Sequence, residues 1–319
     1  MFRVVVTDDR FGSYSEENEV LKELGIEVEV HNLQTEREGK KVLSDVDGII
    51  VNLFPLPASI ITELRRCKVI SRYGVGYDNV DVTAATKRGI WVARVPDYCI
   101  EDVSDHALSL LLSCIRGVAF KDRMVRAGKW NVFPSNRISR IQGKVLGLLG
   151  YGGIARCLHK KAAGFGLGKV LVCDPFIGEK AIREAGAEPA AFDTLLKNSD
   201  YISIHVPLNN ETRGMIGSKE FELMKEDVII INTSRGPIID ETALYGALKN
   251  SQKCAGIDVF ETEPLPGDSP LRTLENITLT DHAGFYSVES IKELKTKAAG
   301  NVLEVLKGNK PLYPVNSLQ

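Results

Sequence analysis

The sequence lacks the features by which several classes of protein are recognised. Its six cysteines are scattered with no CxxC pair, which argues against a metal or redox site and fits reduced thiols in the cytoplasm. The formal net charge is −2 and no basic run stands out, so nucleic acid is not expected as a partner. No apolar run approaches the roughly 18 residues of a membrane span, so no membrane is expected either.

Short β-rich runs do alternate with amphipathic segments through most of the chain. FRVVVT and DGIIV are strand-like, and EENEVLKELG is helix-like, which predicts βαβ units and parallel sheets with helices on both faces. The 319 residues allow about two domains. A second alternation predicts the strands of a doubly wound dinucleotide-binding domain at 145–149, 169–173, 200–204, 228–232, 254–259 and 277–280.

The segment between the two alternations has a different pattern. From Ile100 the apolar residues recur at spacings of three and four, which predicts one long helix running towards Phe120. The following stretch, AGKWNVFPSNRISRIQG at 127–143, mixes proline, asparagine and aromatic residues. It is predicted to be an irregular arm outside the core.

A glycine-rich turn follows the predicted strand at 145–149. Gly150, Gly152 and Ala155 match the pattern G-x-G-x-x-G/A between an apolar strand and a helix. The first glycine permits a tight turn, the second lets the backbone approach a pyrophosphate, and the small third residue lets the helix pack on the strand. The next strand ends in Asp174, at the spacing of a carboxylate that binds ribose hydroxyls and repels a 2′-phosphate. NAD is therefore the predicted cofactor, and the alternative is a turn in a sheet that binds no nucleotide.

Three polar side chains come directly after later apolar runs. NTSRG carries Arg235, FETEP carries Glu263 and TDHAG carries His282. Ligands of an open parallel sheet bind outside the carboxyl ends of its strands, so the three are expected near the cofactor. An anion-binding group, a carboxylate and a base are the set that hydride transfer to a 2-oxo acid needs. Each also has a plainer interpretation: a helix cap or surface ion pair for Arg235, a solvated loop acid for Glu263, and a strand-end histidine for His282.

Six stretches carry a resemblance to a known family: SRYGVGYDNVD, EDVSDHALSLLL, LLGYGGIA, NTSRGPIID, GIDVFETEP and HAGFY. In order and spacing, over roughly residues 70 to 286, the chain resembles the D-isomer-specific 2-hydroxyacid dehydrogenase family. It is most similar to the branch that holds the C-terminal-binding proteins and bacterial phosphoglycerate-dehydrogenase-like relatives. The resemblance implies that Arg235 binds the substrate carboxylate and carbonyl oxygen, that His282 exchanges a proton with that oxygen, and that Glu263 orients His282. It also implies that Asp258 contacts the nicotinamide end of NAD.

Further contacts are expected from nearby segments. HVPLNN is expected to pass the nicotinamide ribose, although the ring of His205 is interpreted as structural, as is His106 on the long helix. In YGVGYDN the glycines uncover successive N–H groups that can bind a carboxylate, the alternative being a plain turn. The expected cofactor contacts are Gly150, Gly152, Gly153, Ile154, Asp174, His205, Pro207, Thr212, Thr233 and Asp258, and the expected substrate contacts are Tyr73, Gly74, Val75, Gly76 and Phe285; no metal ligand is expected.

The resemblance finally implies a domain plan and an activity. A Rossmann NAD-binding domain at 101–283 would be inserted in a flavodoxin-like substrate domain made of 1–100 and 284–319. A homodimer, formed through the long helix and the arm around Trp130, would transfer hydride reversibly between NADH and a 2-oxo acid. That acid is expected to be small or apolar, because the loop VNLFPLP has no lysine or arginine. The alternative is an NAD-sensing dimeric binding protein, similar to a corepressor, with little turnover.

Overall fold

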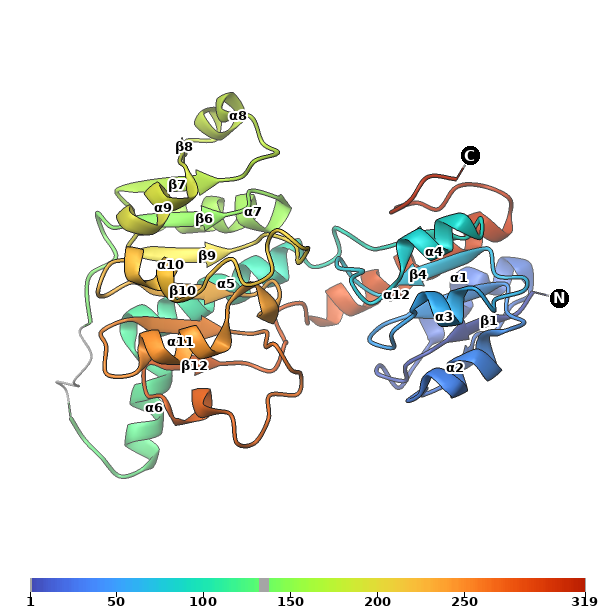
Figure 1. The fold of residues 1–319 in the computed structure, drawn as a ribbon, viewed down its shortest axis with the longest axis horizontal. Coiled ribbons are helices and arrows are strands. Elements are labelled where there is room, and N and C mark those ends of the chain that lie inside the picture. The colour runs from blue at the N-terminus through green and yellow to red at the C-terminus, as the bar shows by residue number, and fades with distance from the viewer. Residues whose placement is uncertain (1, 132–137, 319) are drawn as a thin grey trace. The chain divides into compact units, whose positions relative to one another are not determined.

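The structure, a computed structural model, describes residues 2–131 and 138–318. It divides the chain into two compact units, one formed by Met1–Cys99 with Ser287–Gln319 and the other by Ile100–Tyr286. Each unit contains one parallel sheet covered by helices, and this confirms the predicted α/β fold class with two doubly wound sheets (Figure 1).

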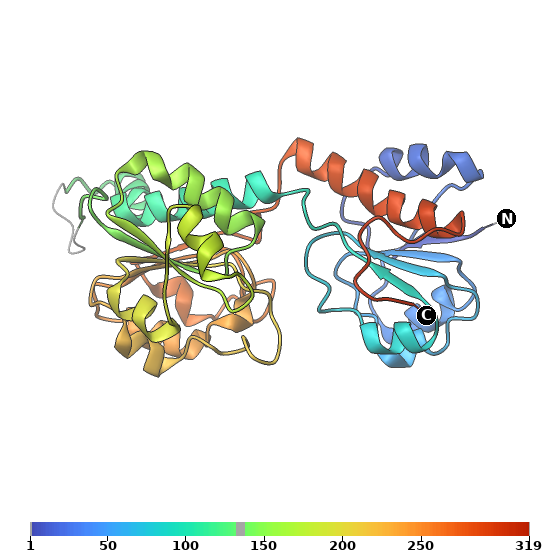
Figure 2. The same cartoon turned by 90° about the horizontal axis from the view of Figure 1, so that it is seen from above.

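The smaller unit has a five-stranded sheet in the order β2-β1-β3-β4-β5, which is the flavodoxin-like order. Its strands are β1 (Val4–Val6), β2 (Glu29–Val30), β3 (Gly48–Val51), β4 (Val69–Arg72) and β5 (Trp91–Ala93). Its helices are α1 (Ser15–Leu21), α2 (Glu36–Leu43), α3 (Ala58–Ile61), α4 (Val82–Lys87) and α12 (Val288–Leu306). Helices α1 and α12 cover one face of the sheet and the others cover the opposite face (Figure 2).

The larger unit has a seven-stranded parallel sheet in the order β12-β11-β10-β9-β6-β7-β8. Its strands are β6 (Val145–Leu149), β7 (Lys169–Cys173), β8 (Glu188–Pro189), β9 (Tyr201–Ile204), β10 (Ile229–Asn232), β11 (Cys254–Ile257) and β12 (Ile277–Leu279). Six of these strands were predicted. The sequence gives no periodic signal for β8, which is only two residues long at the edge of the sheet. After β8 the chain returns to place β9 beside β6, and folds of this type bind dinucleotides at such a reversal of strand order.

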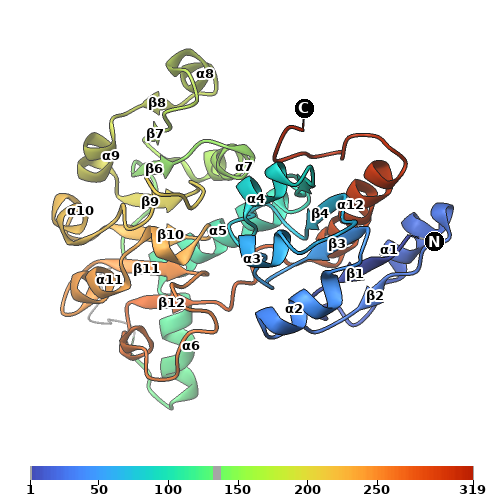
Figure 3. The ribbon, with the colours of Figure 1, turned by 45° about the vertical axis from the view of Figure 1, so that its right-hand side comes forward.

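Helices cover both faces of the larger sheet (Figure 3). They are α5 (Ile100–Arg116), α6 (Val118–Arg126), α7 (Gly153–Ala162), α8 (Glu179–Glu184), α9 (Phe192–Asn198), α10 (Ser218–Leu223) and α11 (Glu241–Leu248). Helix α5 packs beside α7 over β10 and β11, whereas α10 packs beside α9 and α11. Gly256 in β11 is required there, because a Cβ on it would lie 3.0 Å from the Cβ of Leu110 in α5.

The long helix predicted from Ile100 is shorter than expected. Gly117 adopts the left-handed conformation, with φ of 63°, so the helix ends at Arg116 and α6 begins on a new axis. Among the described residues no single helix is long and apolar enough to cross a membrane; α5 and α6 meet that requirement only as a pair, bent by 63°. The predicted arm at 127–143 has no helix or strand in its described part, and its residues 132–137 lie outside the described residues.

Candidate active site

The glycine-rich turn joins β6 to α7 with the geometry that its sequence pattern requires. Gly150 has φ of 85°, and a Cβ on it would lie 2.9 Å from the carbonyl carbon of His205. A Cβ on Gly152, by contrast, would meet no atom within 4 Å, so the backbone there is open to a ligand. Ala155 is fully buried between α7 and the sheet. The first N–H groups of α7, including those of Gly153 and Ile154, have no acceptor within the helix and suit a phosphate.

Asp174 follows β7 and ties the end of this strand to the turn. Its Oδ2 accepts a hydrogen bond from the Tyr151 N–H at 2.7 Å, and its Oδ1 accepts one from the Phe176 N–H at 2.8 Å. Each carboxylate oxygen keeps a second lone pair, so the same group can still accept hydrogen bonds from ribose hydroxyls.

The loop after β10 is held by Asn232, a buried side chain that sequence reasoning did not single out. Its Oδ1 accepts a hydrogen bond from the Ser234 N–H at 3.0 Å, and its Nδ2 donates to the Arg235 carbonyl at 2.9 Å. Gly236 then presses against the segment after β11, where a Cβ on it would lie only 1.9 Å from the carbonyl carbon of Phe260. This contact sets Arg235 beside the segment that carries Glu263.

His282 and Glu263 lie against each other. The distance between His282 Nδ1 and Glu263 Oε2 is 2.7 Å, and Glu263 Oε1 accepts a hydrogen bond from the Phe260 N–H at 3.0 Å. Burial by itself would raise the pKa of Glu263, but the His282 contact, the Phe260 N–H and the charge of Arg235 together hold this pKa below its usual value. The ring of Phe285 stands edge-on to the His282 ring, with centroids 6.1 Å apart. The structure therefore brings together the arginine, the glutamate and the histidine.

The backbone of His282 is left-handed, with φ of 57°. For a residue with a side chain this conformation costs about 1–2 kcal/mol, so the loop needs local support. Asp258 provides it: its carboxylate accepts hydrogen bonds from the N–H groups of Ala283 and Gly284, both at 3.0 Å, and from the Thr280 hydroxyl at 2.6 Å. Asp258 thus contacts the His282 loop, and no nicotinamide contact is needed to explain its burial. Asp281, the residue directly before His282, is exposed.

The other expected cofactor contacts, which follow β9 and β10, differ in how their side chains are hydrogen-bonded. His205 Nε2 pairs with the Ser203 hydroxyl at 2.8 Å, and desolvation lowers the pKa of His205 to about 4, so its ring stays neutral. The Thr212 hydroxyl donates to the Pro207 carbonyl at 2.6 Å and closes that loop on itself. The Thr233 Oγ1, in contrast, is buried and has no hydrogen-bond partner among the described residues. Of these side chains, Thr233 has the clearest unused capacity for a ligand.

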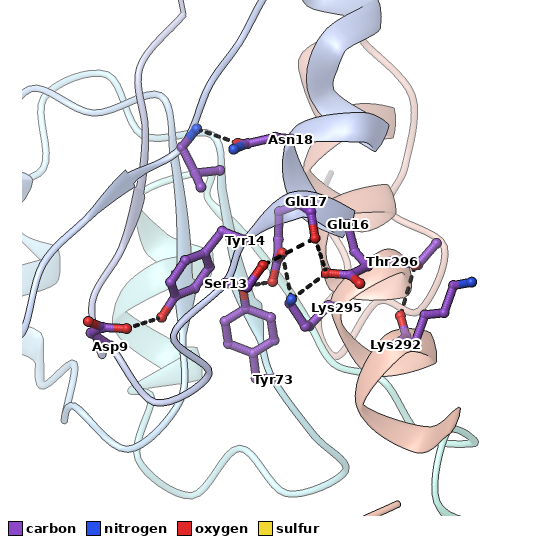
Figure 4. A network of polar contacts seen from close by, with 12 residues as sticks. Asp9, Ser13, Tyr14, Glu16, Glu17, Asn18, Tyr73, Lys292, Lys295 and Thr296 are labelled. Carbon is purple, nitrogen blue, oxygen red and sulfur yellow. Dashed lines mark hydrogen bonds and ion pairs between the residues drawn. The ribbon is translucent and has the colours of Figure 1, made fainter. Parts of the chain in front are cut away.

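In the smaller unit, the side chain of Tyr73 points into the core and not outward. Its hydroxyl donates to Glu17 Oε1 at 2.5 Å, and Lys295 forms ion pairs with Glu16 and Glu17 (Figure 4). Burial raises the pKa of Glu17, although Tyr73 and Lys295 oppose the effect. This buried network holds the Tyr73 side chain in the core, at the start of the YGVGYDN loop. Any contact from Tyr73 to a substrate would therefore have to come from its backbone.

The glycines after Tyr73 leave N–H groups uncovered. Gly74 has φ of 140°, and within the described part of the chain the N–H groups of Val75 and Gly76 have no acceptor. Arg94, which follows β5 and which sequence reasoning missed, lies beside them: its Nη1 is 3.4 Å from the Val75 carbonyl oxygen and its guanidinium is 5.7 Å from the Tyr77 ring. Two amides and a guanidinium at one loop are groups that suit an anion.

Comparison with known proteins identifies the family of the chain. The family model described as "D-isomer specific 2-hydroxyacid dehydrogenase, NAD binding domain" matches residues 108–284, more than half of the chain. Glyoxylate reductase of Korarchaeum cryptofilum is 39% identical over 87% of this chain and 86% of its own length. D-3-phosphoglycerate dehydrogenase of Methanocaldococcus jannaschii is 36% identical over 97% of this chain and 58% of its own length.

A solved structure agrees with these relatives. The crystal structure of a glyoxylate reductase from Paecilomyes thermophila superposes with a TM-score of 0.89 at 29% identity, covering 98% of each chain. The fold, the glycine turn and the matched residues lead to one conclusion: the chain belongs to the D-isomer-specific 2-hydroxyacid dehydrogenase family, and residues 108–284 match the NAD-binding domain of that family.

Proposed function

We propose that this protein is an NAD-dependent D-2-hydroxyacid dehydrogenase, which reversibly reduces a 2-oxo acid with NADH to the D-2-hydroxy acid. The observation that carries the proposal is the 2.7 Å contact between His282 Nδ1 and Glu263 Oε2, with Arg235 close enough to lower the pKa of Glu263. A base, the carboxylate that orients it and a cation are the groups that this reaction uses.

The contact with Glu263 fixes how His282 would work. If Nδ1–H donates to Glu263, the other ring nitrogen, Nε2, is the one that faces the reaction. In the reductive direction Nε2–H gives a proton to the carbonyl oxygen as the carbonyl carbon receives a hydride, and in the oxidative direction Nε2 takes the proton back. Arg235 binds the substrate and offsets the negative charge that develops on the oxygen. Bound NADH supplies the hydride.

The residues present suit a dinucleotide. The open backbone at Gly152 and the first N–H groups of α7 would hold the pyrophosphate, and Asp174 would accept the ribose hydroxyls. The Thr233 hydroxyl, which has no partner in the described part of the chain, would donate to the nicotinamide half. A carboxylate at position 174 would repel a 2′-phosphate, which supports NAD over NADP.

The substrate would be a small 2-oxo acid whose carboxylate meets the N–H groups of Val75 and Gly76. Arg94, beside the same loop, adds a positive charge that favours an acid over a neutral carbonyl compound. Glyoxylate and hydroxypyruvate belong to this class of substrate. We also propose a cytoplasmic location, where the six cysteines, all unpaired in the structure, would stay reduced.

The experiment is a panel of 2-oxo acids followed by loss of NADH absorbance, with wild type, His282→Ala and Glu263→Gln. We expect His282→Ala to lose most turnover, about 100-fold to 10,000-fold in kcat, while the Kd for NADH stays near the wild-type value. Glu263→Gln keeps an acceptor for Nδ1–H but loses the charge, so its loss is expected to be smaller. If His282→Ala turns over at the wild-type rate, the assignment of the base is wrong. A wild type that binds NADH but reduces no acid on the panel would instead favour the NAD-sensing binding protein.

A further inference from the structure

A second histidine–carboxylate contact lies under the loop that carries His282. His106, on α5, places its Nε2 3.2 Å from Asp258 Oδ1 and 3.0 Å from the Thr280 Oγ1. The Asp258 side chain is almost fully buried, and the His106 side chain is 23% exposed. This group is separate from the contact between His282 and Glu263.

Thr280 Oγ1 and Asp258 Oδ1 lie 2.6 Å apart and share a hydrogen bond. The direction of this bond determines which atom of His106, Thr280 and Asp258 carries each hydrogen. A threonine hydroxyl has a single proton, and a carboxylate can only accept, so Thr280 donates to Asp258. The Thr280 oxygen is then left as an acceptor towards His106. Nε2 of His106 must therefore carry a hydrogen, which it shares between the Thr280 oxygen and the Asp258 carboxylate. His106 acts as a donor in this group.

Asp258 in turn accepts three hydrogen bonds from backbone N–H groups of the loop that carries His282. Its carboxylate accepts from Ala283 and Gly284, and its carbonyl oxygen accepts from the His282 N–H at 2.9 Å. These bonds surround the one left-handed residue of the loop, His282 itself. The backbone that carries the His282 ring is therefore tied to Asp258.

Two glycines make the approach of His106 possible. Gly256 lets α5 lie close on β11, two residues before Asp258. A Cβ on Gly284 would lie 2.9 Å from Asp258 Oδ2 and 3.3 Å from His106 Cδ2, so the loop also closes on this pair without a side chain. Helix, strand end and loop are packed around one imidazole and one carboxylate.

We propose that His106 is a positioning residue for the reaction: its N–H holds the Asp258 carboxylate, which holds the left-handed loop and so keeps the His282 ring against Glu263. The inference rests on the proposed role of His282 as the acid and base. Among the described residues the polar partners of His106 are Asp258 and Thr280, so its proposed effect on His282 is indirect.

The test compares His106→Leu, which removes the donor, with His106→Gln, whose side-chain N–H reaches to nearly the position of Nε2. We expect His106→Leu to lower kcat about 10-fold to 100-fold, as displacement of a catalytic group by about 1 Å does, with the Kd for NADH within twofold of wild type. His106→Gln should recover most of that loss. Ser109→Ala, on the same helix but exposed and bonded only to the Asp105 carbonyl, is the matched control and should behave like wild type.

Hydrogen exchange gives a readout that does not depend on turnover. The amides of the segment 280–286 should exchange faster in His106→Leu than in wild type, His106→Gln or Ser109→Ala. If His106→Leu proves unstable, Thr280→Val removes the shared hydroxyl with little change of shape and should produce the same acceleration and a smaller loss of kcat.

The outcomes separate this inference from the proposed function. Unchanged exchange at 280–286 in both His106→Leu and Thr280→Val overturns the positioning role, whatever the activity. So does a kcat for His106→Gln that is no better than that of His106→Leu, because packing alone would then explain the effect. Faster exchange at 280–286 in His106→Leu, together with a wild type that reduces no 2-oxo acid, would uphold the loop contact and reject the proposed function.

Discussion

At the scale of single residues, Asp258 connects the chemistry of the loop to the stability of the fold. Burial by itself would raise the pKa of Asp258, but hydrogen bonds from His106, Thr280 and the Gly284 N–H, together with the charge of His106, lower this pKa from 3.8 to about 2. A carboxyl group whose pKa is depressed in the folded state stabilises the fold above its unfolded pKa. That contribution is lost as the pH falls from about 4 to about 2, and the shift corresponds to about 2 kcal/mol.

The predicted consequence concerns Asp258→Asn. Its urea unfolding midpoint should lie below that of wild type at pH 7, and the gap should narrow as the pH falls below about 4, since wild type then loses the contribution that the variant lacks. Unfolding curves at several pH values between 7 and 3 measure the gap. Asp281→Asn, at the exposed neighbouring position, should follow wild type throughout. A gap between wild type and Asp258→Asn of the same size at every pH would show that Asp258 contributes by shape alone.

At the scale of elements, the packing of the β10 loop on the β11 loop decides where Arg235 lies. We predict that Gly236→Ala lowers the free energy of unfolding by about 1–3 kcal/mol, because the new methyl group would overlap backbone atoms of Phe260 and force the two loops apart. The displaced loop should also raise KM for the 2-oxo acid more than it changes the Kd for NADH. Thermal unfolding and steady-state kinetics measure the two effects.

The control for that prediction is Gly246→Ala, in the middle of α11. A Cβ on Gly246 meets nothing within 4 Å, so alanine there should leave KM unchanged and add about 0.5–1 kcal/mol of helix stability. Equal effects from the two substitutions would contradict the argument, because both exchange one glycine for one alanine and only the Gly236 site is crowded.

Elements whose pattern is long and regular were predicted from the sequence, and elements fixed by one residue or by distant contacts were not. The strands at 145–149 and 169–173 were placed to the residue, since apolar runs bounded by turn signals define a buried parallel strand. The strand β8 and the break at Gly117 depend on edge pairing and on one left-handed glycine, which leave no periodic trace.

The residues of the candidate site likewise fall into those that were predicted from the sequence and those that were not. His282 and Glu263 were paired in advance, because the carboxyl ends of parallel strands share an edge and the resemblance named both residues. The proximity of Arg94 to Val75 and the contact of His106 with Asp258 were missed. Both depend on tertiary packing between separate segments, which the local sequence does not show. Nothing in the local sequence of α5 distinguishes a histidine that contacts a buried carboxylate from a core histidine.

At the scale of the whole molecule, helix α6 and the residues just after it expose three large apolar side chains. None of the residues of α6 is buried. The side chains of Val118 and Val125 are 57% and 54% exposed, and Trp130 is 86% exposed. Large apolar side chains gathered on one segment are typical of a protein interface. A second copy of the chain, presenting the same surface, is the partner that we propose for them.

Light scattering coupled to gel filtration tests this homodimer, because wild type should then run at twice the chain mass of 35.1 kDa. Trp130→Glu and Val125→Asp each place a charge in the proposed interface and should shift the mass towards the monomer, since an unpaired charge is costly to bury. Leu312→Glu adds a charge at an exposed apolar position of the other unit and should leave the mass unchanged. A monomeric wild type, or interface variants that keep the wild-type mass, would mean that α6 and Trp130 serve some other contact.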